Sequence, residues 1–288
     1  MRQVRAADEV VWYYDTKSKT YNETFDTLYF KIYDVITWKY LDPYVPTNSD
    51  ALVLDAGGGT GRWSFRMARK GCKVVLMDIS EKMLEIATKR ARKEGLQHKI
   101  IIKRGDITKT SYADESFDMI LCEHALFLFK DPDILLKELR RVLKKKARLI
   151  ISAPNRYVQS LVSLPEKPAL SNMDNAIDIL FRKKHRTMTK QGKVKIYTWT
   201  PNEFRKMLER NGFQVEKIVG KCVTMPLRIS PKLYTTKKYP KDLFNDILKF
   251  ELALCEKPDA LSLAGHLQAI VCKQPLENRT KSASGYWF

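Results

Sequence analysis

The chain has 288 residues, of which 44% are hydrophobic and 30% charged, and these values are typical of a globular protein with a sizeable core. No uninterrupted apolar run approaches the roughly 18 residues of a membrane span, and the first residues lack the apolar segment of a secretory signal. The five cysteines are dispersed without a CxxC pair, which argues against a disulfide framework and a structural zinc site. We therefore expect a cytoplasmic protein built as one large domain or as one domain with insertions.

Lysine and arginine number 52 against 33 aspartates and glutamates, which gives a formal net charge of +19. A polyanionic partner such as RNA is one interpretation of this excess, and a lysine-rich solvated surface is the other. The basic residues are spread over the whole chain, with short clusters only at 144–146 and 182–186. Because a nucleic-acid-binding protein more often concentrates its basic residues on one element, the pattern favours the solvated surface.

Strand-like and helix-like segments alternate after residue 50, which predicts an α/β fold around a parallel sheet. The predicted strands are short and mostly apolar, as expected of strands buried on both faces, and lie at residues 51–55, 73–78, 99–106, 117–126, 147–155, 214–221 and 266–273. Helices are predicted at residues 62–71, 80–95, 131–146, 171–181, 201–212 and 241–254.

Four glycines follow the first predicted strand, in the stretch LDAGGGTG. Glycine lets the backbone turn tightly and lets a ligand approach main-chain N–H groups, and ligands of such sheets bind beyond the carboxyl ends of the strands. The spacing is Asp55-x-Gly57-x-Gly59-x-Gly61, whereas a dinucleotide fingerprint GxGxxG from Gly57 would need a glycine where Arg62 stands. Phosphate-loop and nucleophile-elbow motifs are also absent from the sequence.

Acidic residues lie at the ends of the next strands. Asp78 ends the second predicted strand, where a carboxylate can accept hydrogen bonds from the ribose hydroxyls of NAD or of another adenosine derivative. The third strand ends in RGDI, which contains Asp106, and the fourth contains the sequence CEH at residues 122–124. None of these features identifies the ligand by itself.

Taken together, the stretches LDAGGGTG, VVLMDISEKML, RGDI and FDMILCEHAL resemble the class I S-adenosylmethionine-dependent methyltransferases, of the type 11 branch that includes quinone- and amine-methylating enzymes. The resemblance covers about residues 50–155 and 197–218. It implies S-adenosyl-L-methionine as cofactor. It also implies a doubly wound, seven-stranded, mostly parallel sheet of the Rossmann-like methyltransferase type, with an antiparallel last strand at residues 266–273 and helical insertions.

The resemblance also implies a domain organisation. The expected parts are an N-terminal helical lid at 1–50, a cofactor-binding core at 51–155, an acceptor-side insertion at 156–196, a completion of the sheet at 197–274 with a second insertion at 222–265, and a tail at 275–288. In one place the chain departs from the family, because Lys144-Lys145-Lys146-Ala147 replaces the usual Lys-Pro-Gly-Gly turn. That turn lies on the face of the sheet opposite the cofactor, so we expect no effect on chemistry.

Carried over by position, the motif residues take roles in cofactor binding. The residues expected around the methionine moiety are Asp55, Gly57, Gly59 and Gly61; those expected at the ribose and adenine are Asp78, Ile79, Met83, Asp106 and Ile107; and those expected where the sulfonium faces the acceptor are Cys122, Glu123 and His124. A loop cap is the structural alternative for Asp106, and ordinary helix packing is the alternative for Met83.

The N-terminal segment is rich in aromatic residues, with eleven between Trp12 and Tyr44. Residues 21–41 are predicted to form one helix that places Tyr21, Phe25, Tyr29 and Tyr33 at i+4 spacing. One interpretation is a lid whose rings favour a cationic amine or stack on a flat ring, and the other is a helix buried against the sheet. In the family, tyrosines of this segment line the cofactor entrance, which assigns Tyr14 and Tyr21 to the catalytic site.

Methyl transfer from a sulfonium is an in-line displacement that needs an aligned acceptor, and needs a base only if the acceptor must lose a proton. His124 is the best candidate for such a base, and a wall residue that binds the backbone is its structural alternative. A small-molecule acceptor and a macromolecular acceptor, RNA or protein, both remain open. The sequence CEHA stands where family members that methylate nucleic-acid amines carry (N/D)PP(Y/F), which favours the small molecule.

Overall fold

The structure is a computed structural model that describes residues 2–163, 173–181, 186–187, 194–224 and 236–274. The predicted tail at 275–288 lies outside the described residues. Among the described helices, none is long and apolar enough to cross a membrane.

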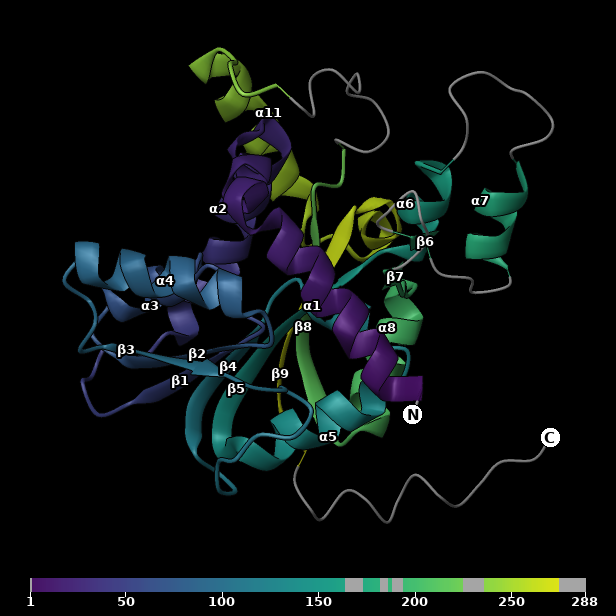
Figure 1. Cartoon of the computed structure of the whole chain (residues 1–288). Helices are drawn as coiled ribbons and strands as arrows, with labels where there is room; N and C mark the ends of the chain where they lie inside the picture. Colours follow the sequence, from purple (N-terminus) through teal and green to yellow (C-terminus); the bar gives the residue numbers. More distant parts are fainter. Residues whose placement is uncertain (1, 164–172, 182–185, 188–193, 225–235, 275–288) are drawn as a thin grey trace.

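A seven-stranded sheet forms the centre of the fold (Figure 1). Its order is β3-β2-β1-β4-β5-β9-β8, with β1 to β5 parallel and β9 antiparallel to both β5 and β8. The strands are β1 (Leu52–Ala56), β2 (Lys73–Asp78), β3 (Ile100–Arg104), β4 (Phe117–Cys122), β5 (Leu143–Pro154), β8 (Phe213–Lys221) and β9 (His266–Lys273). The predicted doubly wound sheet with an antiparallel last strand is confirmed.

Both faces of the sheet are buried, which explains the continuous apolar runs. Val53 and Leu54 are adjacent on β1 and both fully buried, yet they belong to separate hydrophobic clusters on opposite faces. Figure 1 shows α3 (Ser64–Ala68) and α4 (Glu81–Lys93) on one side of the sheet and α5 (Pro132–Val142) on the other. The remaining helix of the common core, α8 (Pro201–Arg210), packs with α5.

Side-chain caps set the beginnings of these helices. Ser80 Oγ accepts a hydrogen bond from the Met83 N–H, which confirms the predicted cap of α4. Thr200 and Glu203 form a reciprocal capping box at the start of α8. The predicted helix 131–146 is too long: it ends at Val142, because Leu143 is buried in β5 opposite Phe117.

The N-terminal segment forms two helices, so the predicted single helix over 21–41 is wrong. They are α1 (Arg2–Tyr21) and α2 (Leu28–Leu41), joined by the short 3-10 helix η1 (Asn22–Asp26). The break occurs at Thr27, whose backbone is extended with φ −76° and ψ 156°, and Asn22 accepts a hydrogen bond of 2.7 Å from Thr60 Oγ1. Polar side chains that bond outside the segment thus compete with helix continuity.

The two N-terminal helices have different positions. Along α2, the residues Leu28, Ile32, Tyr33 and Ile36 are fully buried against the sheet face that also carries α3 and α4. In contrast, α1 runs across the carboxyl ends of the strands (Figure 1). The aromatic segment is therefore core in its second half, and only α1 and η1 are placed to cover a ligand.

Both insertions add helices at the end of the sheet where the parallel strands have their carboxyl ends. The first contains α6 (Arg156–Leu161), α7 (Met173–Leu180), and the paired strands β6 (Arg186–Thr187) and β7 (Lys195–Ile196); α6 was not predicted. The second contains α11 (Lys241–Leu254), which has the predicted bounds, and η5 (Pro258–Leu263). Tyr40 links α2 to the second insertion through hydrogen bonds to Cys255 Sγ (3.0 Å) and Glu256 (2.6 Å).

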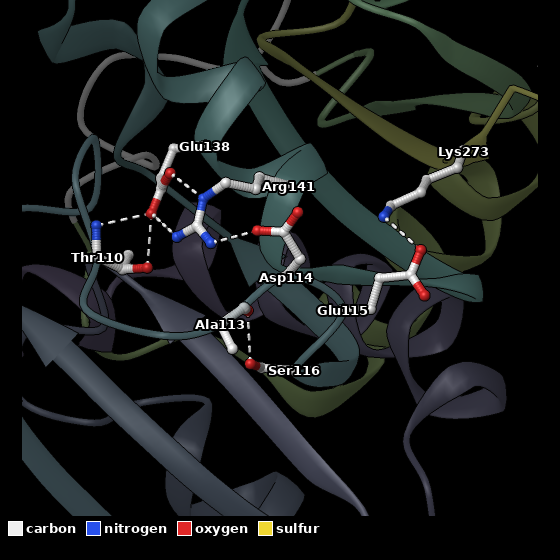
Figure 2. Close-up of polar contacts among 8 residues, drawn as sticks. All are labelled: Thr110, Ala113, Asp114, Glu115, Ser116, Glu138, Arg141 and Lys273. Atoms are coloured by element: carbon white, nitrogen blue, oxygen red, sulfur yellow. Dashed lines mark hydrogen bonds and ion pairs between the residues drawn. The ribbon is translucent and has the colours of Figure 1, made fainter.

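A polar network fixes the loop between β3 and β4 to α5 (Figure 2). Glu138 Oε1 accepts hydrogen bonds from the Thr110 backbone N–H (2.7 Å) and hydroxyl (2.6 Å). Arg141 donates to Glu138 Oε2 (2.9 Å) and to Asp114 (2.7 Å). This network holds the loop whose first part, residues 105–108, borders the cavity described below.

Deleting residues 1–20 should leave a cooperatively unfolding protein, whereas deleting residues 1–40 should not. The longer deletion removes Leu28, Ile32 and Ile36, and each such buried side chain contributes about 1.5–3 kcal/mol. A typical domain has a total free energy of unfolding of only about 5–15 kcal/mol. Calorimetric melting of both truncations beside the full chain measures the difference. A 1–40 deletion that melts like the full chain would contradict the core position of α2.

Candidate active site

The glycine turn after β1 is built around left-handed backbone conformations. Gly57 and Gly59 have φ of 77° and 54°, which side chains rarely tolerate. A Cβ added at Gly57 would lie 2.8 Å from the Ala125 Cβ, so the turn also needs glycine for space. Gly61 has φ 82° and packs against Phe65, away from the residues that border the cavity.

A cavity of about 370 Å³ lies beyond the carboxyl ends of β1, β2 and β4, at the point where the strand order reverses. Its wall includes ten of the residues discussed here: Tyr14, Tyr21, Gly57, Gly59, Asp78, Ile79, Met83, Asp106, Ile107 and His124. The structure thus brings most of the sequence-predicted site residues together around one space.

Asp78 connects the second strand to the glycine turn. Its Oδ2 accepts a hydrogen bond of 2.9 Å from the Gly59 N–H, and its Oδ1 accepts one of 2.9 Å from the Ser80 N–H. Burial raises the pKa of Asp78, and these backbone donors oppose that shift. The carboxylate therefore fixes the turn and also borders the cavity beside Ile79 and Met83.

Asp106 caps its own loop and also borders the cavity. Its Oδ1 accepts hydrogen bonds from the Thr108 backbone N–H (2.8 Å) and hydroxyl (2.7 Å), as a loop cap does. The residue is also exposed and borders the cavity, next to the buried side chain of Ile107. A ligand in the cavity can therefore reach a carboxylate whose direction the loop has already set.

A second, smaller space of about 30 Å³ lies on the other side of the turn and shares Tyr21, Gly57 and His124 with the main cavity. Asp55 borders this space, is 1% exposed, and accepts a hydrogen bond of 2.6 Å from Ser64 Oγ. Burial raises the pKa of Asp55 to about 7, with smaller contributions from Asp78 and Glu123. A cation at this position would favour the ionised carboxylate.

The residues at the end of β4 and directly after it, Cys122 to His124, lie in three environments. Cys122 is fully buried and borders neither cavity, and burial raises the pKa of its thiol. Glu123 borders the smaller space and accepts hydrogen bonds from Lys221 Nζ (2.8 Å) and from the Tyr33 hydroxyl. Sequence reasoning missed Lys221; its one signal was a lysine at the end of the apolar strand at 214–221.

His124 has a left-handed backbone with φ 57°, and its backbone N–H donates to Ser152 Oγ at 3.2 Å. Burial, then Lys221 and then Arg62, lower the pKa of His124 to about 3, so the imidazole is neutral at physiological pH. Its Nε2 is buried and has no hydrogen-bond partner among the described residues. A neutral side chain of this kind can accept a proton or a hydrogen bond from a ligand.

Tyr14 and Tyr21, predicted in the catalytic site, lie in the cover formed by α1. Their rings are 5.9 Å apart in an edge-to-face arrangement, and both border the cavity. Burial raises the pKa of each hydroxyl, so both remain protonated at physiological pH. They can bind through ring faces and hydroxyl groups, and neither is suited to act as a base.

Comparison with known proteins agrees with this geometry. The model of a family described as "Methyltransferase domain" matches residues 47–212. A demethylmenaquinone methyltransferase of Bacteroides fragilis is 31% identical over 153 residues, which are 49% of this chain and 60% of that protein. The methyltransferase GfsG of Streptomyces halstedii is 37% identical over 101 residues, which are 35% of this chain and 36% of that protein.

Other relatives match over more of the chain at lower identity. A tRNA 5-carboxymethoxyuridine methyltransferase of Escherichia coli is 24% identical over 225 residues, covering 77% of this chain and 79% of that protein. The structure of an S-adenosylmethionine-dependent methyltransferase from Mesorhizobium loti superposes with a TM-score of 0.57 at 19% identity, covering 82% of this chain and 97% of that one. This last likeness supports the fold.

The site and the fold together define a Rossmann-like methyltransferase. The chain belongs to the methyltransferase-domain family, within the class I S-adenosylmethionine-dependent methyltransferases. The residues fit the cofactor of that family, S-adenosyl-L-methionine. A ligand can reach the backbone at Gly57 and Gly59, whose positive φ favours glycine, and Asp78, Ile79 and Met83 border the same cavity.

Replacing Asp78 by alanine should weaken binding of S-adenosylhomocysteine more than tenfold. The substitution removes the carboxylate that holds the Gly59 N–H and borders the cavity, and hydrogen bonds to a charged group contribute about 1.5–3 kcal/mol each. Titration calorimetry measures the dissociation constant, with Asp246→Ala, at an exposed aspartate of α11 that borders neither cavity, as the matched control. An unchanged dissociation constant for Asp78→Ala would contradict the assignment.

Binding of the cationic cofactor should weaken as the pH falls through about 7. Asp55 is protonated below that pH in the free protein, whereas a bound cation favours its ionised form, so binding below pH 7 must release a proton. Affinity for S-adenosylmethionine should therefore rise with pH and level off above 7. Titration calorimetry at pH 5.5 to 8.5 tests this expectation. The Asp55→Asn variant should lose the dependence, and a variant that keeps it would assign the titration to another group.

Proposed function

We propose that the chain transfers a methyl group from S-adenosyl-L-methionine to a small-molecule acceptor, which offers an amine, hydroxyl, thiol or activated ring carbon. The observation that supports this best is the cover over the site. The cavity at the carboxyl ends of the strands is walled by α1 through Val10, Tyr14 and Tyr21. A walled cavity suits a small acceptor better than a groove open to a macromolecule does.

When bound, the cofactor supplies an electrophilic methyl group on a sulfonium. The residues of the chain bind, orient and exclude water. Asp78 and the amide groups of the glycine turn hold one end of the site, and Ile79, Met83 and Ile107 provide an apolar wall. Phe25, at the smaller space, stacks on the Arg62 guanidinium at 3.6 Å and helps to shield this region from water.

Methyl transfer to RNA or protein is the second candidate, and two observations favour it. The formal net charge is +19, and one relative is a tRNA methyltransferase. Against it, several basic residues of the surface are already paired with acids: Lys31 with Asp26, Arg148 with Glu216, and Arg210 with Asp133. These three basic side chains are therefore already engaged by nearby acids.

Methyl incorporation from labelled cofactor should be found with a small acceptor and not with RNA. The purified chain is incubated with amines, quinols, phenols, thiols, total RNA and total protein, and binding to total RNA is titrated by fluorescence anisotropy at low and physiological salt. If Lys and Arg contact phosphates, log–log plots of RNA affinity against salt fall with a slope of about −0.7 to −0.9 per contact. Sub-micromolar RNA binding at physiological salt, with methyl incorporation into RNA, would contradict the small-molecule proposal.

A further inference from the structure

A second histidine lies directly behind His124. His266 begins β9, and its ring stacks on that of His124 with the centroids 5.0 Å apart and the planes inclined by 24°. The hydroxyl of Tyr29, on α2, shares a hydrogen bond of 3.2 Å with His266 Nδ1. Two of the four histidines of the chain are thus in contact, although they are 142 positions apart in the sequence.

The histidine pair lies within aromatic side chains. The ring centroid of His124 is 6.5 Å from that of Phe25, 6.1 Å from that of Phe30 and 5.9 Å from that of Phe127. Of these rings, Phe25 borders the smaller space, whereas Tyr14, Tyr21 and Phe129 border the main cavity together with His124, and rings of this kind can stack on a flat ligand. An acceptor that approaches His124 therefore meets an aromatic environment with one unpartnered ring nitrogen, Nε2.

Burial, with a smaller contribution from nearby positive charge, keeps both imidazoles neutral. Burial lowers the pKa of His124 and of His266, and the ammonium of Lys221 lowers both further. The charged groups that act on the pair are Lys221 on β8, Arg62 beside the glycine turn, and Glu123, which follows β4 and is bound to Lys221. Two tyrosines are also in contact with the pair: Tyr29 bonds to His266, and Tyr33 packs against its ring, where burial raises the pKa of the Tyr33 hydroxyl.

Two backbone positions near the histidine pair have a left-handed conformation that is unfavourable for non-glycine residues. Two of the three described non-glycine residues with positive φ are His124 (57°), the second residue after β4, and Cys222 (56°), the first residue after β8. Each comes immediately after a member of the buried Glu123–Lys221 pair. Left-handed non-glycine residues persist where the surrounding structure requires them, and they cluster at functional sites.

We propose that His124 and His266 together form the proton-accepting site for an acceptor that carries a hydroxyl group on a flat ring, a phenol or a quinol. The proposal rests on the proposed methyl-transfer function and names the acceptor class. His124 contacts the hydroxyl through Nε2. His266, held by Tyr29, is a positioning residue that fixes the orientation of the His124 ring.

A lone pair of the hydroxyl oxygen forms the new bond to the methyl carbon, and the carbon–sulfur bond breaks with its electron pair left on sulfur, which becomes a neutral thioether. The hydroxyl proton passes to His124 Nε2, and the positive charge of the sulfonium is carried by the imidazolium until the proton leaves to water. The product is a methyl ether.

The low basicity of the two histidines favours hydroxyl acceptors over amine acceptors. Attack by a hydroxyl oxygen generates a protonated ether, which is a much stronger acid than any imidazolium, so even a histidine of lowered pKa removes the proton. A methylated ammonium is a much weaker acid than the imidazolium of His124 and would keep its proton. Amine acceptors would therefore gain nothing from this pair, whereas hydroxyl acceptors would.

Binding of two probes with the same ring separates these classes. 2-Naphthol carries the hydroxyl, and 2-naphthylmethylamine carries an ammonium at neutral pH. Each is titrated by ligand-observed NMR into the full chain saturated with S-adenosylhomocysteine. We expect naphthol to bind at least tenfold more tightly than the amine. Equal binding, tighter binding of the amine, or binding of neither probe would overturn the proposal.

Variants test the assigned residues. His124→Asn, whose new side chain tolerates the left-handed backbone, should weaken naphthol binding about tenfold and leave the affinity for S-adenosylhomocysteine within twofold. His98 is exposed and borders neither cavity, so His98→Asn is the matched control and should change neither dissociation constant. An unchanged naphthol affinity in His124→Asn would overturn the assignment of Nε2.

Turnover measurements distinguish a positioning role of His266 from a purely structural one. Wild-type protein with labelled cofactor and 2-naphthol should form the naphthyl methyl ether, and His266→Gln should lower kcat at least tenfold with KM for naphthol within twofold. Absence of the ether with naphthol bound, or equal changes in kcat and KM, would overturn the proposed roles. Loss of S-adenosylhomocysteine binding by the wild type would instead refute the proposed methyl-transfer function, so the two failures are distinguishable.

Discussion

The glycine turn after β1 depends on the end of β2, and the geometry of the site depends on that turn. The Gly57 and Gly58 N–H groups donate to the Met77 carbonyl at 2.8 and 3.2 Å, and the Gly59 N–H donates to Asp78. The backbone donors of the turn therefore find their acceptors at the end of the neighbouring strand, β2. The order of strands in the sheet therefore fixes where a ligand can approach the main chain.

Much of the sheet and of the cofactor side of the site follows from local sequence. The strands are short apolar runs because both of their faces are buried, and Asp78 and Asp106 stand at their carboxyl ends, where the fold places ligands. For Gly61, the role that the motif predicts differs from the role in the structure. The motif assigns it to the cofactor, whereas its Cβ position is filled by the Phe65 ring, so its glycine serves packing.

The interactions that local sequence did not predict join distant segments. An aromatic stripe on a helix matches a lid and a buried core helix equally well, since spacing shows that one face is apolar and leaves its partner open. In the structure, α2 fills the core while α1 covers the cavity, and Thr27 separates them. The pairing of Glu123 with Lys221 spans 98 positions and has no short-range signal. Such contacts follow only from the complete topology.

The buried Glu123–Lys221 pair affects the electrostatics of the site more than the stability of the fold. Lys221 is fully buried, and removing two charges from water costs several kcal/mol per ion, so a buried ion pair contributes little net stability. Glu123 Oε2 has no hydrogen-bond partner among the described residues, although it lies at the border of the smaller space. An apolar pair would fill the same volume without that cost. The pair instead holds a negative oxygen at the border of the smaller space, and a positive nitrogen that adds to the effect of burial in lowering the pKa of both histidines. The same ion pair therefore contributes to the electrostatics on both sides of the site.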